Sequence, residues 1–483
     1  MRKVEYDAVV VGSGPNGLAG AITLQRAGLS VLVVEAKPTI GGGMRSAELT
    51  LPGFVHDVCS AIHPMAMLSP FFKSVPLKDF GLEMIQPEYA AAHPFDDGNA
   101  AVLHQSLAET ADGLGIDKGA YLDFMQPLVE DLPGLLPDLL GPLEWPKHPV
   151  DLAAFGIKAL PPASWTRKFF KTKEARGLWA GMAAHAIQPL QNVATSAFGI
   201  MLMAAAHLKG WPIPKGGSQS VANALTDYFK TIGGEVETDF EVKSLDELPA
   251  SKVVLLDVTP KQLLSIAGEK LSASHRKRLE RFRYGMGVFK IDWALEEPIP
   301  FKAEACKKAG TVHLGNTFEE IAYSEKSLSN GKHIEKPFVL LAQQSLFDPS
   351  RVPAGKQAAW AYCHVPNGST KDMTDIIENQ VERFAPGFKD VIKGKHVMNT
   401  VQIEAYNPNY VGGDINGGIQ DIFQLYSRPT LQFSPYRTSA EGVYLCSSST
   451  PPGGGVHGMC GYHAAKQALK DVFKIKTTQF ARV

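Results

Sequence analysis

The chain has 483 residues, and its 48 Lys and Arg against 49 Asp and Glu leave a net charge of −1 at pH 7. A nucleic-acid-binding protein needs an excess of positive surface, so this balance argues against one. Hydrophobic residues make up 45% and charged residues 20%, which predicts a globular protein of roughly two or three domains with a sizeable core.

The five cysteines are odd in number and scattered along the chain, which argues against a secreted disulfide framework. We therefore expect a reducing, cytoplasmic compartment. No stretch reaches the roughly 18 apolar residues of a membrane span. The most apolar stretch, residues 193–206, predicts a buried helix, and the alternative is a helix that lines an apolar site or touches a membrane.

The first fifty residues predict a strand–helix–strand unit. A buried β-branched run at residues 7–11 leads into Gly-Ser-Gly-Pro-Asn-Gly at residues 12–17. A helix of small residues follows at 18–27, and a second buried strand at 31–34 ends in Glu35. Strand, glycines, helix, strand and acid in this order are typical of a dinucleotide-binding site.

Each part of this unit has a physical role. Gly12 permits the tight turn, Gly14 lets the backbone approach a pyrophosphate, and Gly17 lets helix and strand pack closely. The helix N-terminus offers N–H groups and a positive dipole end to the phosphates. Glu35 is expected to accept hydrogen bonds from ribose hydroxyls.

A glycine cluster follows directly, in the sequence IGGGMRS at residues 40–46. Its place after the ribose-binding acid resembles the second fingerprint of FAD-binding proteins, with Arg45 placed to pair with a phosphate. The alternative is a surface glycine loop with a solvated arginine. We therefore predict FAD as the dinucleotide.

The rest of the chain divides into segments of different predicted secondary structure. Residues 71–210 are irregular and rich in proline, with helical stretches such as 118–130, whereas residues 211–290 return to alternating helix and strand. We predict an α/β fold in which a discontinuous Rossmann-type FAD-binding domain, of glutathione reductase or amine oxidase type, carries an α+β substrate domain. The FAD-binding domain is expected at residues 1–70, 211–290 and 435–483, and the substrate domain at 71–210 and 291–434.

The last informative block is a strand at residues 442–446, a turn rich in Ser, Pro and Gly, and a helix from about 459 to 473. A helix N-terminus without bulky side chains suits the N1–O2 edge of a flavin, which becomes negative on reduction. His457, Cys460 and His463 have no fourth ligand nearby and drift around the helix, so no metal site is predicted.

Four segments together resemble the phytoene desaturase-like family of FAD-dependent oxidoreductases, which includes carotenoid desaturases and isomerases. They are VVVGSGPNGLAGAITLQRAGLSVLVVEA, IGGGMRSAELTLPGFVHD, YGMGVFKIDWALEEPIP and SSSTPPGGGVHGMCGYHAAKQAL. The resemblance implies non-covalent FAD in an extended form. One departure is Ser447-Ser448, where related flavoproteins often have Gly-Asp or Gly-Ala. By position, the resemblance assigns FAD contacts to Gly12, Gly14, Pro15, Asn16, Gly17, Glu35, Ala36, Gly42, Gly43, Arg45, Val242, Gly455, Val456 and Met459.

The resemblance further implies an oxidoreductase that takes a hydride from a lipophilic, isoprenoid- or carotenoid-like substrate. The electrons are expected to leave to oxygen or a quinone, because only one complete dinucleotide site is present. Tyr410 and Asp414 lie in a segment that resembles a family loop near the flavin, and they are the candidate catalytic residues. The alternatives are a saturase, an isomerase or an amine oxidase on the same scaffold, or a flavin-stabilised protein without catalysis. Peripheral membrane contact is a further expectation.

Overall fold

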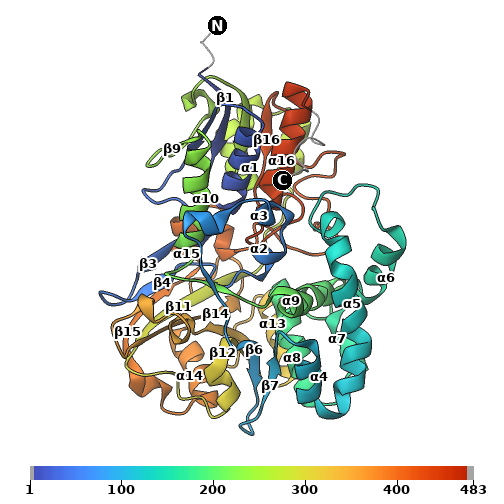
Figure 1. Cartoon of the computed structure of the whole chain (residues 1–483), viewed down its shortest axis with the longest axis vertical. Helices are drawn as coiled ribbons and strands as arrows, with labels where there is room; N and C mark the ends of the chain where they lie inside the picture. Colours follow the sequence, from blue (N-terminus) through green and yellow to red (C-terminus); the bar gives the residue numbers. More distant parts are fainter. Residues whose placement is uncertain (1–4, 476–483) are drawn as a thin grey trace.

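The computed structural model describes residues 5–475, and Figure 1 shows two β-sheets, one at each end of the molecule, with a helical lobe beside the second. The first sheet is parallel and has the strand order β16-β10-β1-β2-β9. Its strands are β1 (Tyr6–Val11), β2 (Val31–Val34), β9 (Glu235–Glu237), β10 (Ser251–Leu256) and β16 (Val443–Leu445).

Both faces of this parallel sheet are covered, which explains the unbroken apolar run of its first strand. Ala8 and Val10 pack into the core on one face, whereas Val9 and Val11 pack into a separate core on the other. A strand buried on both faces has no polar positions to alternate with. The covering helices include α1 (Pro15–Arg26), α10 (Gln219–Thr231), α11 (Pro260–Ala267), α12 (Ala273–Leu279) and α16 (Met459–Ala468).

The second sheet is mixed and has the strand order β15-β11-β14-β13-β12-β6-β7, with only the β12–β6 pair parallel. One sequence-distant pairing within it, between β6 and β12, joins the early part of the chain to its middle. The strands are β6 (Tyr89–Pro94), β7 (Ala100–Leu103), β11 (Gly287–Leu295), β12 (Ala309–Leu314), β13 (Val339–Ala342), β14 (Gln357–Val365) and β15 (Ile392–Met398). The helices α13 (Phe318–Ser329), α14 (Thr374–Phe384) and α15 (Thr400–Tyr406) accompany them.

The helical lobe occupies most of the segment that was expected to be irregular. Its longest helix, α5, runs from Lys118 to Leu139 through three internal prolines, Pro127, Pro133 and Pro137. Packing overrides the low helix propensity of proline here, because the helix buries Leu128, Leu132 and Leu135 in the main core. The other helices are α4 (Leu107–Gly113), α6 (Pro149–Ala159), α7 (Ala163–Thr166), α8 (Lys173–Ala183) and α9 (Thr195–Lys209).

Short elements connect the two sheets. They are β3 (Ser46–Glu48) paired with β4 (Val55–Asp57), β5 (Met84–Ile85) paired with β8 (Ile213–Pro214), and the helices α2 (Pro64–Leu68) and α3 (Pro70–Lys73). The apolar run at residues 193–206 forms most of α9. Within residues 5–475, no helix is long and apolar enough to cross a membrane.

Candidate active site

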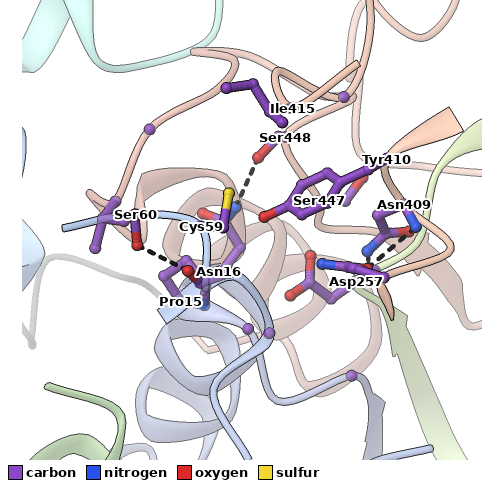
Figure 2. A pocket seen from close by; sticks show the side chains of 18 of the residues that line it. Pro15, Asn16, Cys59, Ser60, Asp257, Asn409, Tyr410, Ile415, Ser447 and Ser448 are labelled. Carbon is purple, nitrogen blue, oxygen red and sulfur yellow. Dashed lines mark hydrogen bonds between the residues drawn. The ribbon is translucent and has the colours of Figure 1, made fainter. Parts of the chain in front are cut away.

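A cavity of about 450 Å³ is lined by residues of both sheets and their connections. That volume lies in the usual range of ligand pockets, about 300–1,000 Å³. At one end the cavity is bounded by the glycine loop between β1 and α1, and on another wall by Trp360 and Tyr362 of β14. A close view of part of this cavity is shown in Figure 2. It therefore joins a nucleotide-binding edge to an aromatic surface.

The glycine loop forms a groove that only glycine permits. Gly12 has a φ of +101°, and a Cβ built on Gly17 would overlap the carbonyl oxygen of Gly12. A Cβ on Gly42 would lie 3.0 Å from the Cα of Gly14, so the two glycine loops approach each other closely. The N-cap of α1, Gly14, makes no side-chain capping bond. Apart from the Gly17 N–H, which donates to Asp257, this end of the helix offers backbone groups to a phosphate-bearing ligand.

Asn16 supplies a polar atom that fits the same interpretation. Its side-chain N–H donates to Ser448 Oγ at 3.4 Å, as the dashed line in Figure 2 shows. Its Oδ1 is buried and has no hydrogen-bond partner in the described part of the chain. A buried polar atom normally has a partner, so a ligand donor at the cavity wall would complete the site. The residues present therefore fit a dinucleotide.

Glu35 lies at the end of β2 with its carboxylate in the cavity wall. Its Oε2 accepts hydrogen bonds from Ser13, from the backbone N–H at 3.0 Å and the hydroxyl at 2.6 Å. Its Oε1 accepts from the Lys37 N–H at 3.0 Å. A carboxylate has about four acceptor positions, so Glu35 retains capacity for a ribose hydroxyl while it also holds the glycine loop in shape.

Arg45 reaches the cavity from the second glycine loop. Its Nε donates to the Gly42 carbonyl at 2.9 Å, and its guanidinium lies 4.3 Å from the centre of the Tyr406 ring. Stacking on an aromatic face and a bond to the loop fix the direction of the charge. The cation is thereby held beside the groove, where it can pair with a phosphate.

Asp257 is a site residue that the sequence analysis missed. It directly follows β10, and its Oδ2 accepts a hydrogen bond from the Gly17 N–H at 3.0 Å. Burial raises the pKa of Asp257 to about 7, the Gly17 N–H opposes this, and the charge of Glu35 raises it further. One signal was available in the sequence: the acid ends a buried strand, and the carboxyl ends of parallel strands share the binding edge of the sheet.

The C-terminal turn places Gly455 and Val456 in the cavity wall. Helix α16 then begins at Met459, and Gly458, its N-cap, has a φ of +67°. The Met459 side chain is buried and does not line the cavity, and its N–H donates to His457 Nδ1 at 3.0 Å. Ser447 and Ser448, which differ from the residues usual in related flavoproteins, both line the cavity. The Ser447 hydroxyl donates a hydrogen bond to the Val258 carbonyl at 2.6 Å.

The structure gathers the assigned FAD contacts around one cavity, apart from two. Gly17 and Met459 are absent from the lining, because Gly17 packs on Gly12 and Met459 points into the core. Gly17 therefore shapes the groove instead of facing it. The assigned residues that line the cavity are Gly12, Gly14, Pro15, Asn16, Glu35, Ala36, Gly42, Gly43, Arg45, Val242, Gly455 and Val456.

The two candidate catalytic residues differ in position. Tyr410 lines the cavity, and Figure 2 shows its hydroxyl directed toward Cys59. Burial raises the pKa of Tyr410 well above its ordinary value, so the phenol is neutral. The prediction that Asp414 lies at the catalytic site is corrected, because Asp414 does not line the cavity. Its carboxylate accepts hydrogen bonds from the backbone N–H groups of Gly285, Asn416 and Gly418 at 2.7–3.0 Å. Asp414 holds the loop in place.

The aromatic wall was not anticipated from the sequence. The rings of Trp360 and Tyr362 are stacked, with centroids 5.6 Å apart and an interplanar angle of 16°. Leu340 on β13 and Thr311 on β12 line the same cavity. Strand β14 is buried almost throughout, so no alternation of polar and apolar residues indicated which face would meet a ligand.

Comparisons with known proteins agree with this architecture. Residues 10–73 match the NAD(P)-binding Rossmann-like domain. The chain is 26% identical to pyridine nucleotide-disulfide oxidoreductase domain-containing protein 2 of Mus musculus, over 97% of this chain and 94% of that protein. It is 23% identical to a limonene dehydrogenase polypeptide of Castellaniella defragrans, over 97% and 95%. The solved structure of cyclohexylamine oxidase from Brevibacterium oxydans superposes with a TM-score of 0.58, at 15% identity over 97% of this chain and 99% of that one.

The protein is an oxidoreductase with the Rossmann-like α/β fold of FAD-dependent enzymes. The predicted fold class, the prediction of an enzyme and the prediction of FAD as its cofactor are thereby confirmed. In fold it is related to the pyridine nucleotide-disulfide oxidoreductases and the amine oxidases. These comparisons do not show membership of the phytoene desaturase family in particular.

Proposed function

We propose that the protein is an FAD-dependent dehydrogenase acting on a lipophilic substrate, as its resemblance to phytoene desaturases implies. The observation that carries this proposal is one continuous cavity that runs from the glycine groove to an apolar wall. Ile62, Met65, Leu202, Leu340 and Trp360 line the part beyond the groove. Such a wall binds hydrocarbon surface by removing it from water.

FAD, when bound, supplies the hydride acceptor, and the chain supplies binding and orientation. Trp360 and Tyr362 present a flat aromatic surface on which an apolar skeleton can lie. His63 in the same lining donates or accepts a bond with Ser218 Oγ at 2.9 Å, and burial lowers its pKa to about 4. His63 is therefore neutral at pH 7. An apolar lining around the reacting carbon also excludes water, which protects a reduced cofactor from side reactions.

Amine oxidation is the second candidate. The stacked pair Trp360 and Tyr362 favours it, because aromatic faces attract ammonium groups. The structural likeness to cyclohexylamine oxidase points the same way. The same wall offers no carboxylate to pair with an amine, since the acidic lining residues, Glu35, Glu241 and Asp257, belong to the nucleotide end.

An anaerobic reduction experiment separates the two functions. FAD-loaded protein would be mixed without oxygen with limonene, chosen from the name of a relative, or with cyclohexylamine and putrescine. We expect bleaching of the flavin absorption by the terpene and none by the amines. Bleaching by the amines alone would overturn the dehydrogenase proposal in favour of amine oxidation. Reoxidation by oxygen or by a soluble quinone would then identify the acceptor class.

Contact with a membrane surface is part of this proposal, because a lipophilic substrate resides in lipid. Exposed apolar side chains are frequent along residues 143–169, the segment that contains α6 and α7: Leu143, Trp145, Val150, Ile157, Leu160, Trp165 and Phe169. Figure 1 shows α6 at the outer side of the helical lobe. Trp145 is 89% exposed and Trp165 64% exposed, and the exposed Lys147 and Lys168 lie beside them in sequence. Tryptophan with nearby lysine is typical of a surface that lies on a membrane.

Vesicle sedimentation tests the membrane contact. We expect the protein to sediment with phospholipid vesicles that contain anionic lipid, and the double variant Trp145→Ser, Trp165→Ser to remain in the supernatant. Val401→Ser is the matched control, because Val401 is 55% exposed on α15, which packs beside β15 at the edge of the second sheet. Equal sedimentation of all three proteins would contradict the contact.

A further inference from the structure

One part of the apolar cavity carries a polar group that the proposed reaction does not use. His185 lies in the short helix η5 (Ala184–Ala186) between α8 and α9, and its Nε2 is 3.0 Å from Nε2 of His313 on β12. Thr311 lies two residues before His313 and therefore on the same face of the sheet. His185 and Thr311 line the cavity, whereas His313 is buried behind them. We name these three residues the histidine corner.

The surroundings of His313 determine where its proton lies. Its Nδ1 is buried, has no hydrogen-bond partner and faces Gly181 of α8, where a built Cβ would lie 2.7 Å away. A buried N–H without an acceptor is costly, so the proton belongs on Nε2, which donates to Nε2 of His185. His185 consequently carries its own proton on Nδ1.

Both rings are neutral. Burial lowers the pKa of His185 to about 3 and that of His313 well below its ordinary value, and the nearby histidines lower both further. Within residues 5–475, the only hydrogen bond of the His185 side chain is the one between its Nε2 and His313, so its Nδ1 has no acceptor there. The corner therefore presents one uncharged N–H donor to the cavity.

Thr311 supplies a second donor. The residue is only 1% exposed, and its Oγ1 has no hydrogen-bond partner among residues 5–475. The apolar side chains of Leu340, on the neighbouring strand β13, and Trp211 line the same cavity. Buried hydroxyls nearly always have partners, so an unpartnered one at a cavity wall indicates that the ligand provides it.

The backbone beside His185 is strained. Ile187, the residue that follows η5, has a φ of +50° and a ψ of +50°, a conformation that β-branched residues rarely adopt. Such strain persists where the surrounding structure requires one position of the chain, often beside a binding site. It holds the turn that carries His185 toward β12.

We propose that His185 and Thr311 bind a neutral oxygen atom of the substrate, a hydroxyl or a carbonyl. The substrate class is thereby an oxygenated lipophile, with the apolar skeleton along Trp360 and Tyr362 and the oxygen at the histidine corner. Two donors and no positive charge suit a neutral acceptor better than a carboxylate. The inference rests on the proposed function for the reaction, whereas the binding preference stands by itself.

Equilibrium binding to FAD-loaded protein tests the preference without turnover. The probes are cyclooctanol, cyclooctane and cyclooctanecarboxylate, which share a ring skeleton and differ in their polar group. Binding would be followed by tryptophan emission, because Trp211 and Trp360 line the cavity. Thr311→Val replaces the hydroxyl with a methyl group of similar size, and we expect it to weaken cyclooctanol binding about three- to tenfold and to leave cyclooctane binding unchanged.

His185→Phe is the second variant, because it keeps a ring of similar size without Nδ1, and the same selective loss is expected. Thr226→Val is the matched control, since Thr226 is also buried without a partner but lies on α10 outside the cavity lining. Equal weakening of cyclooctanol and cyclooctane would overturn the proposal, as would tighter binding of the carboxylate than of the alcohol. Selective binding together with a flavin that no lipophile bleaches would refute the proposed function and leave this inference standing.

Discussion

The nucleotide groove and the cavity wall formed by β12, β13 and β14 are built in different ways. The groove is mainly backbone, from a continuous stretch in which Gly12, Gly14 and Gly42 bring two loops together. The wall is made of side chains from β12, β13 and β14, such as Thr311, Leu340 and Trp360, which meet only because these strands are neighbours in the sheet. The groove therefore depends on local conformation, whereas this wall of the cavity depends on tertiary packing.

The largest expected effect breaks the link between the two regions. Asp57 of β4 forms an ion pair at 2.6 Å with Arg351, and both side chains are fully buried. Arg351 also bonds Asp348 at 3.0 Å. Arg351→Met leaves two buried carboxylates without their cation, and we expect the free energy of unfolding to fall by about 3–5 kcal/mol in urea titration. Lys215→Met is the control, because its exposed pair with Glu83 is worth about 0–1 kcal/mol.

The same pair gives a pH dependence with a defined sign. Burial alone would raise the pKa of Asp57, but the charge of Arg351 and the Ser218 N–H more than offset this and hold the pKa below its ordinary value. The stabilisation is therefore present above about pH 4, the unfolded pKa, and is lost as the pH falls below it. In Arg351→Met the cation no longer offsets burial, so the pKa of Asp57 rises and its carboxylate takes up a proton between pH 7 and pH 4. The deficit in unfolding free energy should therefore shrink over that range. A deficit that stays constant from pH 7 to pH 4 would show that packing, not charge, causes the loss.

Glu35→Gln tests the nucleotide groove alone. The substitution keeps the shape and weakens charge-assisted hydrogen bonds worth about 1.5–3 kcal/mol each, so FAD affinity should fall about tenfold or more in equilibrium dialysis. Glu237→Gln is the control, since Glu237 ends the neighbouring strand β9 and is exposed. The flavin released when the protein is denatured should be FAD and not FMN. Unchanged retention of FAD by Glu35→Gln would show that the Glu35 carboxylate does not contact FAD.

Asp257 connects the groove to pH. Burial raises the pKa of Asp257 to about 7, so its carboxyl ionises beside the glycine loop as the pH rises through neutrality. A new negative charge there repels phosphates, and we expect FAD affinity to fall up to about tenfold between pH 6 and pH 8. Asp257→Asn retains an acceptor for the Gly17 N–H and should abolish this pH dependence. Identical pH profiles of the wild type and the variant would contradict the assignment.

The smallest expected effect concerns the turn before α16. Gly455 has a φ of +125° and lines the cavity, so Gly455→Val both strains the backbone and fills the space of close approach. We expect retained FAD with a lower flavin midpoint potential, because the helix dipole stabilises negative charge by about 0.3–2 kcal/mol. Potentiometric titration measures this. An unchanged or higher potential would place the turn away from the electron-rich edge.

The elements that could be predicted from the sequence are those whose structure depends on neighbouring residues alone. The glycine run, Glu35 and the turn at Gly458 were recognisable because backbone conformation and helix capping are local properties. Helix α5 was predicted as a stretch ending near residue 130, yet it continues to Leu139 through Pro133 and Pro137. Burial against the main core outweighs the local cost of proline there, and that burial is not visible in the sequence.

The amino-acid sequence by itself determined the cofactor class, because the order of strand, glycines, helix and acid is set within some thirty neighbouring residues at the start of the chain. The tertiary structure alone decided the substrate end. Asp414 was predicted to be catalytic because its loop resembles a family loop near the flavin. Three backbone N–H groups instead donate hydrogen bonds to its carboxylate, away from the cavity. His185 and Thr311, 126 residues apart by their numbers, became neighbours of one cavity only through the packing of η5 against β12. A contact between side chains so distant along the chain depends on the whole fold, and no local pattern of residues encodes it.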